Sequence, residues 1–252
     1  MPLAAADTDW RAFRAGLVRS EAAAAAPPAV GAALVGGDAG APARAASEWA
    51  HPIALPEEGC VLLAHPQMFT DGQQKYFHQA VIFLFDHSKE GSAGIILNRK
   101  TSYTMGAVST EARDAGFADC PLYLGGDVGK DTIHMLHPHV GVEGSAEVVR
   151  GVRMGGFEGA SAAVAEGTPA TDFRWFVRYC GWGPGQLEKE VGLNVWILAA
   201  ASPEVILGET EGNKWAEVLS LLGEDYAQMA RAHETDNVAE DGGDSGDGAR
   251  RL

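Results

Sequence analysis

Short apolar runs, each bounded by polar residues, Gly or Pro, recur along the chain between residues 60 and 201. Cys60–Ala64, Gln79–Phe85 and Ala93–Leu97 are the clearest runs, and their length and boundaries predict buried β-strands. The segment 86–92, between the second and third runs, is polar and contains glycine, so we expect it to be the loop of an antiparallel hairpin. Weaker patterns predict further strands at residues 122–124, 132–136, 147–152 and 194–201.

Helical patterns occur late in the chain, after most of the predicted strands. Residues Glu158–Glu166 are rich in alanine, and the glycine and proline behind them are helix stop signals. Asp172 can cap a second helix, in which the apolar residues of Phe173–Cys180 share one face. Apolar residues spaced i, i+3, i+4 and i+7 within Trp215–Leu222 predict a final amphipathic helix. Because strands come first and helices gather late, we expect an α+β fold with a mixed, largely antiparallel sheet and packed helices.

The two ends of the chain differ in composition from the middle. The first 50 residues contain 19 alanines, and residues 21–46 are almost entirely Ala, Gly, Pro and Val, which is typical of a flexible linker. Ahead of it, apolar residues within Trp10–Val18 form a stripe that can dock as one helix. Residues Glu234–Gly248 are acidic and nearly free of apolar side chains, as in a solvated tail. We therefore expect an N-terminal arm at 1–50, a single domain at 51–230 and an acidic tail at 231–252.

Composition narrows the class of partner. The 252-residue chain is 46% hydrophobic, which is ample for a packed core, and 19 basic and 34 acidic residues give it a net charge of −15. Residues 50–230 alone carry 12 basic and 23 acidic side chains, a net charge of −11. Nucleic acid and anionic membranes attract clustered Lys and Arg, and no apolar run reaches the ~18 residues of a membrane span. We expect a protein partner or a small ligand, with no direct nucleic-acid binding and no membrane.

Four segments stand out in a fixed order: GCVLLAHP at 59–66, the stretch 77–99 that ends in GIILNR, YLGGDV at 123–128 and GWGPGQLEKE at 181–190. Together they resemble the AlgH/YqgE family of bacterial proteins, which has plastid relatives. The resemblance implies a single α+β domain. Members are often labelled transcriptional regulators, but the resemblance brings no agreed activity or ligand.

This chain departs from the family pattern at three positions. His78 replaces a cation after the phenylalanine, Lys100 stands where proline usually follows Asn-Arg, and Asp127 replaces the proline after Gly-Gly. The segment DWRAFRAGLV at 9–18 is also similar to one ahead of the domain in plastid members. We therefore expect a soluble intracellular protein, located in the chloroplast by this resemblance or otherwise in the cytoplasm, although the first 50 residues do not have the composition of a transit peptide.

Glycine-rich and strand-end positions are the candidate ligand-binding residues. They are Asn98, Arg99, Gly125, Gly126, His137, Gly181, Trp182, Gly183, Pro184, Gly185 and Gln186. The turn at 181–186 is either a ligand cradle, with backbone N–H groups facing an anion at the start of a helix, or a helix cap and tight turn packed by its tryptophan. Arg99 either holds a carboxylate or phosphate or pairs with a core acid such as Asp86.

The sequence predicts no catalytic residue, metal site or cofactor. His65, His134, His137 and His139 do not assemble a metal site by their spacing, because in a strand 134 and 137 face opposite sides. The three cysteines lack a Cys-x-x-Cys pattern and are expected to be buried thiols. Residues 86–88 read Asp-His-Ser, but triad members must converge from different elements. The leading interpretation is a non-enzymatic binding or regulatory protein. The alternative is a small-molecule or nucleotide-binding enzyme that uses the glycine-rich turn and the Asn98/Arg99 surface.

Overall fold

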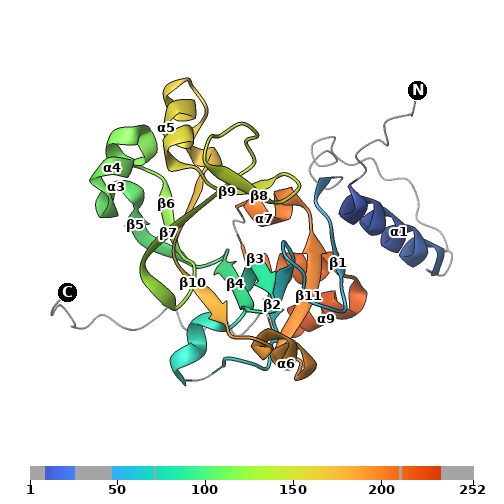
Figure 1. Cartoon of the computed structure of the whole chain (residues 1–252). Coiled ribbons are helices and arrows are strands. Elements are labelled where there is room, and N and C mark those ends of the chain that lie inside the picture. The colour runs from blue at the N-terminus through green and yellow to red at the C-terminus, as the bar shows by residue number, and fades with distance from the viewer. Residues whose placement is uncertain (1–8, 26–46, 71, 210–211, 234–252) are drawn as a thin grey trace, which may run out of the picture.

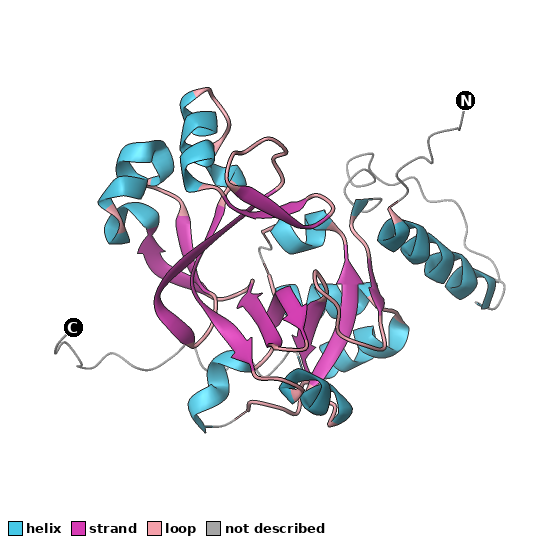
Figure 2. Cartoon of the chain, viewed as in Figure 1, coloured by secondary structure: helices cyan, strands magenta, loops and turns pink. Residues whose placement is uncertain are grey.

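The computed structural model describes residues 9–25, 47–70, 72–209 and 212–233, which form an eleven-stranded sheet flanked by helices (Figures 1 and 2). The strands are β1 (Ala50–Pro52), β2 (Val61–Ala64), β3 (Val81–Ser88), β4 (Gly91–Ile96), β5 (Lys100–Thr104), β6 (Pro121–Leu124), β7 (Val128–His137), β8 (Ser145–Val149), β9 (Val152–Gly155), β10 (Arg174–Trp182) and β11 (Trp196–Ala201). Their order is β1-β11-β2-β3-β4-β10-β7-β9-β8, with β6 paired to β10 and β5 to β6. The strand pairs described are antiparallel except β6 with β10, which confirms the expected α+β class and mixed sheet.

Strand β10 joins two halves of the sheet. Its first part, Arg174–Val177, lies between β6 and β7, and its last part, Cys180–Trp182, pairs with β4. The register shifts between these parts at Arg178, whose φ of 66° lies in the left-handed region. This bulge turns the strand from one half-sheet into the other.

The helix expected over Phe173–Cys180 is therefore wrong. Phe176 and Trp175 are both buried, but in different core clusters on opposite faces of β10. A strand covered on both faces carries apolar residues without strict alternation, so its pattern can imitate a helical stripe.

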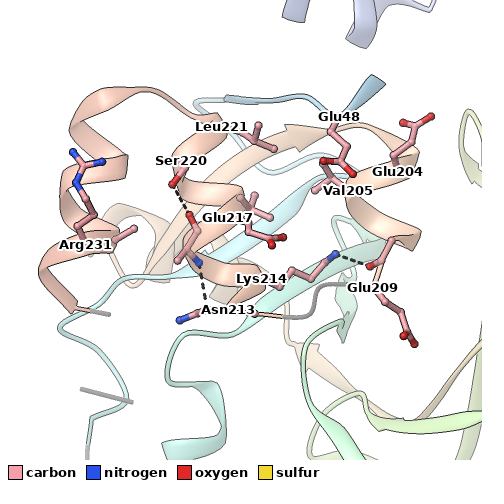
Figure 3. A pocket seen from close by; sticks show the side chains of 15 residues that line it. Glu48, Glu204, Val205, Glu209, Asn213, Lys214, Glu217, Ser220, Leu221 and Arg231 are labelled. Carbon is pink, nitrogen blue, oxygen red and sulfur yellow. Dashed lines mark hydrogen bonds between the residues drawn. The ribbon is translucent and has the colours of Figure 1, made fainter. Parts of the chain in front are cut away.

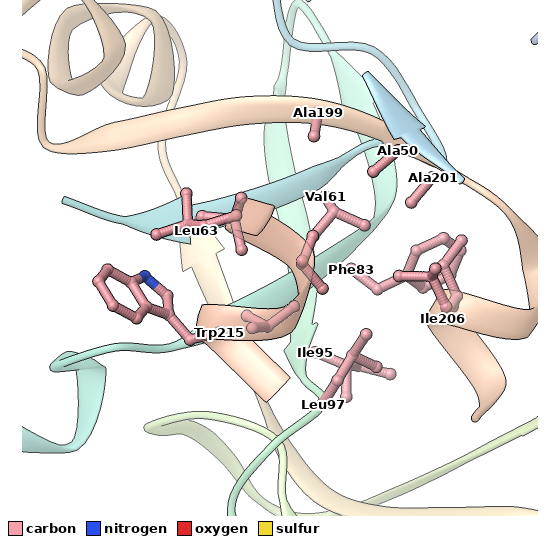
Figure 4. Close-up of a cluster of buried hydrophobic side chains, with 14 of the residues drawn as sticks. Ala50, Val61, Leu63, Phe83, Ile95, Leu97, Ala199, Ala201, Ile206 and Trp215 are labelled. Carbon is pink, nitrogen blue, oxygen red and sulfur yellow. The ribbon is translucent and has the colours of Figure 1, made fainter. Parts of the chain in front are cut away.

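Three core clusters hold the helices against the sheet. One face of the β1-to-β4 half packs against α7 (Pro203–Leu207), α8 (Lys214–Leu221) and α9 (Glu224–His233), around Trp215 (Figure 4). The other face is covered by the 3₁₀ turns of η1 (Gly72–Phe77) and by α6 (Gln186–Gly192). The third cluster lies under α3 (Met105–Val108), α4 (Thr110–Ala112), the π-helical turn η2 (Arg113–Phe117), α5 (Phe157–Ala165) and η3 (Ala170–Asp172). No helix in these described ranges is long and apolar enough to cross a bilayer.

Several boundaries differ from those expected. The β3–β4 hairpin is confirmed, but the strands extend into the expected loop and leave a turn at 89–90. The strand expected at 147–152 is instead the β8–β9 hairpin. The helix at Trp215–Leu222 is confirmed as α8, but α9 follows it. The acidic tail from Glu234 onward lies outside the described residues.

Helix α1 (Trp10–Ala25) docks by a different face from the one expected. Ala15 packs with Trp49 and Ala200, and the guanidinium of Arg11 donates to the Glu57 carboxylate (2.9 Å). The apolar stripe within Trp10–Val18 faces outward instead, with 71% of Trp10 exposed. The helix extends to Ala25, into the expected linker, and residues 26–46 of that linker lie outside the described residues.

Candidate ligand-binding site

Segments that are far apart in the sequence meet beside the bulge of β10. The N–H of Gly125 donates to the carbonyl of Val177 (2.8 Å), and its own carbonyl accepts from the N–H of Ile96 (2.9 Å). The N–H of Leu124 donates to the carbonyl of Arg99 (2.8 Å). The ends of β4 and β6 therefore contact the middle of β10, and the glycine-rich turn follows directly from the end of β10.

The two glycines at 125 and 126 allow close backbone packing. A Cβ on Gly126 would lie 2.1 Å from the carbonyl carbon of Tyr179, and one on Gly125 would lie 2.4 Å from the carbonyl oxygen of Arg178. Backbone atoms at a bulge cannot move aside without disturbing the sheet, so only glycine fits at these positions. The close approach also brings the next residue, Asp127, to the wall of a pocket.

Arg99 is turned inward and binds main-chain carbonyls. Its Nε donates to the carbonyl of Tyr76 (3.0 Å), its Nη1 to the carbonyl of Asn98 (3.3 Å), and its Nη2 to the carbonyl of His78. Burial lowers the pKa of this guanidinium. The described part of the chain pairs Arg99 with no carboxylate, including that of Asp86, whereas the expected contact with a ligand carboxylate or phosphate stays a prediction. Arg99 instead fixes the segment at the end of η1.

Asn98 fixes the chain between η1 and β3. Its Nδ2 donates to the carbonyl of Gln79 (2.9 Å), and its Oδ1 accepts from the N–H of Val81 (3.0 Å). Gln79 has a φ of 53°, so the backbone turns sharply at this point. Asn98 and Arg99 therefore position η1, whose last residue, Phe77, lines the pocket.

The glycine-rich turn is closed by its own hydrogen bonds. The N–H of Gln186 donates to the carbonyl of Gly183 (3.0 Å), and the Gln186 side chain returns the contact by accepting from the N–H of Gly183 (3.1 Å). Gly185 adopts a φ of 70° directly before α6, and Pro184 lies between Gly183 and Gly185. Because the Gly183 N–H is occupied, the turn does not present it to an anion.

Glu190, on α6, ties this turn to the start of β11. Its Oε2 accepts from the indole N–H of Trp182 (2.9 Å) and from that of Trp196 (2.7 Å). Its Oε1 accepts from the Gln186 side-chain amide (2.9 Å). One carboxylate thus fixes both indole rings, which lie edge to face at 6.1 Å between centroids.

These elements enclose a pocket of about 270 Å³, named here the turn pocket. It is lined by Phe69, Gln74, Phe77, Asp127, Cys180, Gly181, Trp182, Gln186, Glu190, Val195 and Trp196. Four of these residues are aromatic, two are carboxylates and none is basic. Aromatic faces and carboxylates both carry negative electrostatic potential, so the chemistry of the wall favours a cation.

Two further titratable groups, Tyr76 and Cys180, interact with Asp127 of the turn pocket, and both are neutral at physiological pH. Burial and a hydrogen bond to the carboxylate of Asp127 both raise the pKa of the Tyr76 phenol. Burial and the same carboxylate raise the pKa of the Cys180 thiol. A protonated thiol is a poor nucleophile, so Cys180 acts here as an apolar wall residue.

His137 lies away from the other candidate residues. Its ring is buried at the end of β7, its Nε2 is 3.2 Å from the carbonyl of Gly155, and it packs against Phe173 and His139. Burial is the main cause that lowers the pKa of His137. It contributes to the packing around the third core cluster and does not line the turn pocket.

The other candidate chemistry considered from the sequence is not assembled. Within the described ranges no three His, Cys, Asp or Glu side chains are arranged to hold a metal ion. The Nδ1 of His87 is 2.8 Å from the Ser92 hydroxyl, and its Nε2 is 3.9 Å from the Glu188 carboxylate. Asp86 and Ser88 are the strand neighbours of His87 and therefore face the opposite side of β3.

Sequence reasoning missed several residues of the turn pocket. Asp127, Glu190 and Trp196 stand within or just after the segments that carry the family resemblance, but nothing in a single sequence shows that their side chains converge. Phe69 and Gln74 belong to no recognisable pattern. The left-handed φ of 62° at Phe69, which turns the chain toward the pocket, is visible only in the structure.

These features define a class of α+β proteins with a bulged central strand and a small aromatic pocket. Residues 61–227 match the family described as AlgH-like, and the chain belongs to this family, as the resemblance implied. A UPF0301 protein of Bacteroides fragilis is 28% identical over 179 residues, which cover 70% of this chain and 88% of the relative. A UPF0301 protein of Chlorobium phaeobacteroides is 32% identical over 183 residues, which cover 71% and 93%.

A solved structure is similar to the same part of the chain. The crystal structure of a protein from Corynebacterium diphtheriae aligns with a TM-score of 0.60 and 21% identity, and covers 70% of this chain and 93% of that one. This likeness concerns the fold. The family in turn is uncharacterised, so the function rests on the residues of the site.

Proposed function

We propose that this protein is a non-enzymatic binding protein whose turn pocket holds a small organic cation. The observation that carries the proposal is the wall of the pocket, with four aromatic rings, the carboxylates of Asp127 and Glu190, and no basic residue. A quaternary or protonated amine gains from aromatic faces by cation–π attraction, worth about 0.5–2 kcal/mol. The volume of about 270 Å³ suits a ligand smaller than a nucleotide.

The alternative of a nucleotide-binding enzyme has less support. Phosphate groups would face Asp127 and Glu190, and the Gly183 N–H is already hydrogen-bonded. Arg99, which offers the kind of group that recognises phosphate, is engaged by carbonyls behind the pocket. These features disfavour an anion in the turn pocket.

Choline tests the proposal directly, because 3,3-dimethyl-1-butanol has the same shape without the charge. We expect calorimetric titration to show choline binding about tenfold more tightly than the neutral analogue, which corresponds to about 1.4 kcal/mol. Trp182 and Trp196 line the pocket, so their fluorescence gives a second readout. Equal affinities for the two compounds, or binding of neither, would contradict the proposal.

The first prediction concerns the charge of Asp127. The Asp127→Asn variant keeps the size of the side chain and removes its charge, so choline affinity is expected to fall about fivefold at low ionic strength. The Asp131→Asn variant removes an exposed carboxylate that does not line the pocket and serves as the matched control. If both variants lose affinity equally, the net charge of the protein and not the turn pocket attracts choline.

The regulator label of the family is compatible with a ligand sensor that does not touch DNA. The net charge of −15 supports the absence of direct nucleic-acid binding. Tight, salt-sensitive binding to random duplex DNA at physiological ionic strength would contradict it.

A plastid location rests on the 9–18 segment alone, since the relatives reported above are bacterial. The distribution of a fluorescent fusion in a plant cell tests this location.

A further inference from the structure

A buried lysine lines a second cavity, away from the turn pocket. Lys214 is the first residue of α8 and is only 6% exposed, yet its side chain borders a cavity of about 930 Å³ between α7, α8 and α9 (Figure 3). Its Nζ donates to the carbonyl of Gly208 (2.8 Å). Figure 3 shows this amine directed across the cavity toward the end of α7. Nothing in the proposed function uses this group.

A second cation lies beside this lysine. Arg174, which is also buried, donates from its Nη1 to the carbonyls of Ile206 (3.0 Å) and Gly208 (3.4 Å). Lys214 and Arg174 thus share the Gly208 carbonyl. The planar face of Arg174 is covered by the ring of Tyr123 at 4.8 Å, so the guanidinium is held in place. Two cations that are close together in a desolvated site favour the neutral form of the stronger acid, which is the lysine ammonium and not the guanidinium.

The charged groups around Lys214 act in both directions. Burial and the charge of Arg174, on β10, lower the pKa of Lys214 to about 8. Glu217 on α8, Glu48 ahead of β1 and Glu209 after α7 oppose this shift. Burial dominates, so about a tenth of the amine is unprotonated at pH 7.

We propose that Lys214 is a nucleophilic amine that condenses with a small neutral aldehyde or ketone. The Nζ lone pair forms a bond to the carbonyl carbon, the amine protons pass to the carbonyl oxygen, and one water molecule leaves, so that an imine remains. The step consumes no oxidant and no reductant. The carboxylates of Glu48, Glu204, Glu209 and Glu217 line the same cavity and disfavour anionic carbonyl compounds such as oxo acids.

Reductive trapping on the native chain tests this proposal. Acetaldehyde and cyanoborohydride convert each imine into a stable ethylamine, and peptide mass analysis reports the labelling of every lysine. At pH 7 we expect Lys214 to be labelled at least about tenfold faster than the exposed Lys100, because far more of its amine is neutral. Glyoxylate, which carries a negative charge, is expected to lose this preference.

Two variants separate the mechanism from simple accessibility. Glu209→Gln removes a charge that keeps Lys214 protonated, so its labelling is expected to accelerate, whereas Glu204→Gln, at another lining residue, leaves the rate unchanged. Lys214→Arg is expected to abolish the fast site and leave the labelling of Lys100 as it was. Labelling of Lys214 that is no faster than that of Lys100, or that occurs only in urea, would overturn the proposal.

Discussion

Two consecutive glycines, Gly125 and Gly126, let the end of β6 approach the bulge of β10 at distances that exclude a Cβ atom. Glycine is required at both positions, since the space that a side chain would take is filled by the backbone of Arg178 beside Gly125 and by that of Tyr179 and Cys180 beside Gly126. The sequence placed both glycines among the candidate ligand-binding residues, and the structure shows that they pack closely against the backbone of β10. The neighbouring Asp127 provides the charge at the turn pocket.

Gly126→Ala is expected to destabilise the protein by about 3 kcal/mol or more, because the added Cβ would overlap the Tyr179 carbonyl group and the β10 backbone would have to shift. The midpoint of urea unfolding measures this change. Gly183→Ala is the matched control, since a Cβ there meets only the flexible Gln186 side chain at 3.9 Å. A Gly126→Ala midpoint as high as that of Gly183→Ala would show that β10 yields easily.

At the scale of elements, the position of η1 depends on two side chains from the end of β4. Arg99 and Asn98 hold the carbonyls of residues 76, 78 and 79 and thereby place Phe77 in the wall of the turn pocket. The residue types at 98 and 99 were recognisable from the sequence as polar groups ending an apolar strand. Their hydrogen-bond partners could not be predicted, because every residue has a main-chain carbonyl and the sequence does not show which carbonyls lie near these side chains.

Arg99→Met is expected to lower stability by about 2 kcal/mol and to loosen η1, since three carbonyls lose a charged donor. Amide exchange at residues 74–79 is expected to accelerate while the β2–β3 pairs stay protected, and choline affinity falls with it. Arg231→Met is the control, because its ion pair with Glu224 is exposed and screened by solvent, so its loss is expected to leave the stability and η1 unchanged. Unchanged exchange in η1 would mean that Arg99 does not position this element.

For the molecule as a whole, the strands and helices with simple patterns were predictable. The β3–β4 hairpin agrees with the expectation because a polar, glycine-containing segment separates its two apolar runs, and α5 and α8 agree because one face of each is exposed. Strand β10 was not predictable, since burial on both faces erased its alternation. The turn at 181–186 could be recognised as a candidate from its own residues. Its convergence with Phe69 and Asp127 could not, because these residues lie far from it in the sequence.

The stability of the whole protein is expected to depend on Lys214 above neutral pH. Folding holds the pKa of Lys214 at about 8, below the ordinary 10.5 of the unfolded chain. Between these values the unfolded state binds the extra proton, so this lysine costs stability fully below pH 8 and ceases to do so as the pH rises past 10.5. The cost amounts to at most about 3 kcal/mol.

Comparison with Lys214→Met isolates this effect. The buried phenols and thiols with raised pKa, such as Tyr76 and Cys180, destabilise both proteins alike at alkaline pH. We therefore expect the variant's stability relative to the native chain to decrease steadily from pH 8 to 10.5, as chemical unfolding at each pH reports. A difference that does not vary with pH would mean that Lys214 titrates as an ordinary lysine.

The placement of β10 also affects how the chain acquires its structure during synthesis. This strand closes the open edge of β4 on one side and joins β6 and β7 on the other, yet it ends only at Trp182. One edge of β2 likewise pairs with β11, which ends only at Ala201. While the ribosome is still making these residues, both half-sheets present unpaired strand edges to the cell. The edges of β4 and β2 therefore stay unpaired until β10 and β11 have been made, and unpaired strand edges favour aggregation.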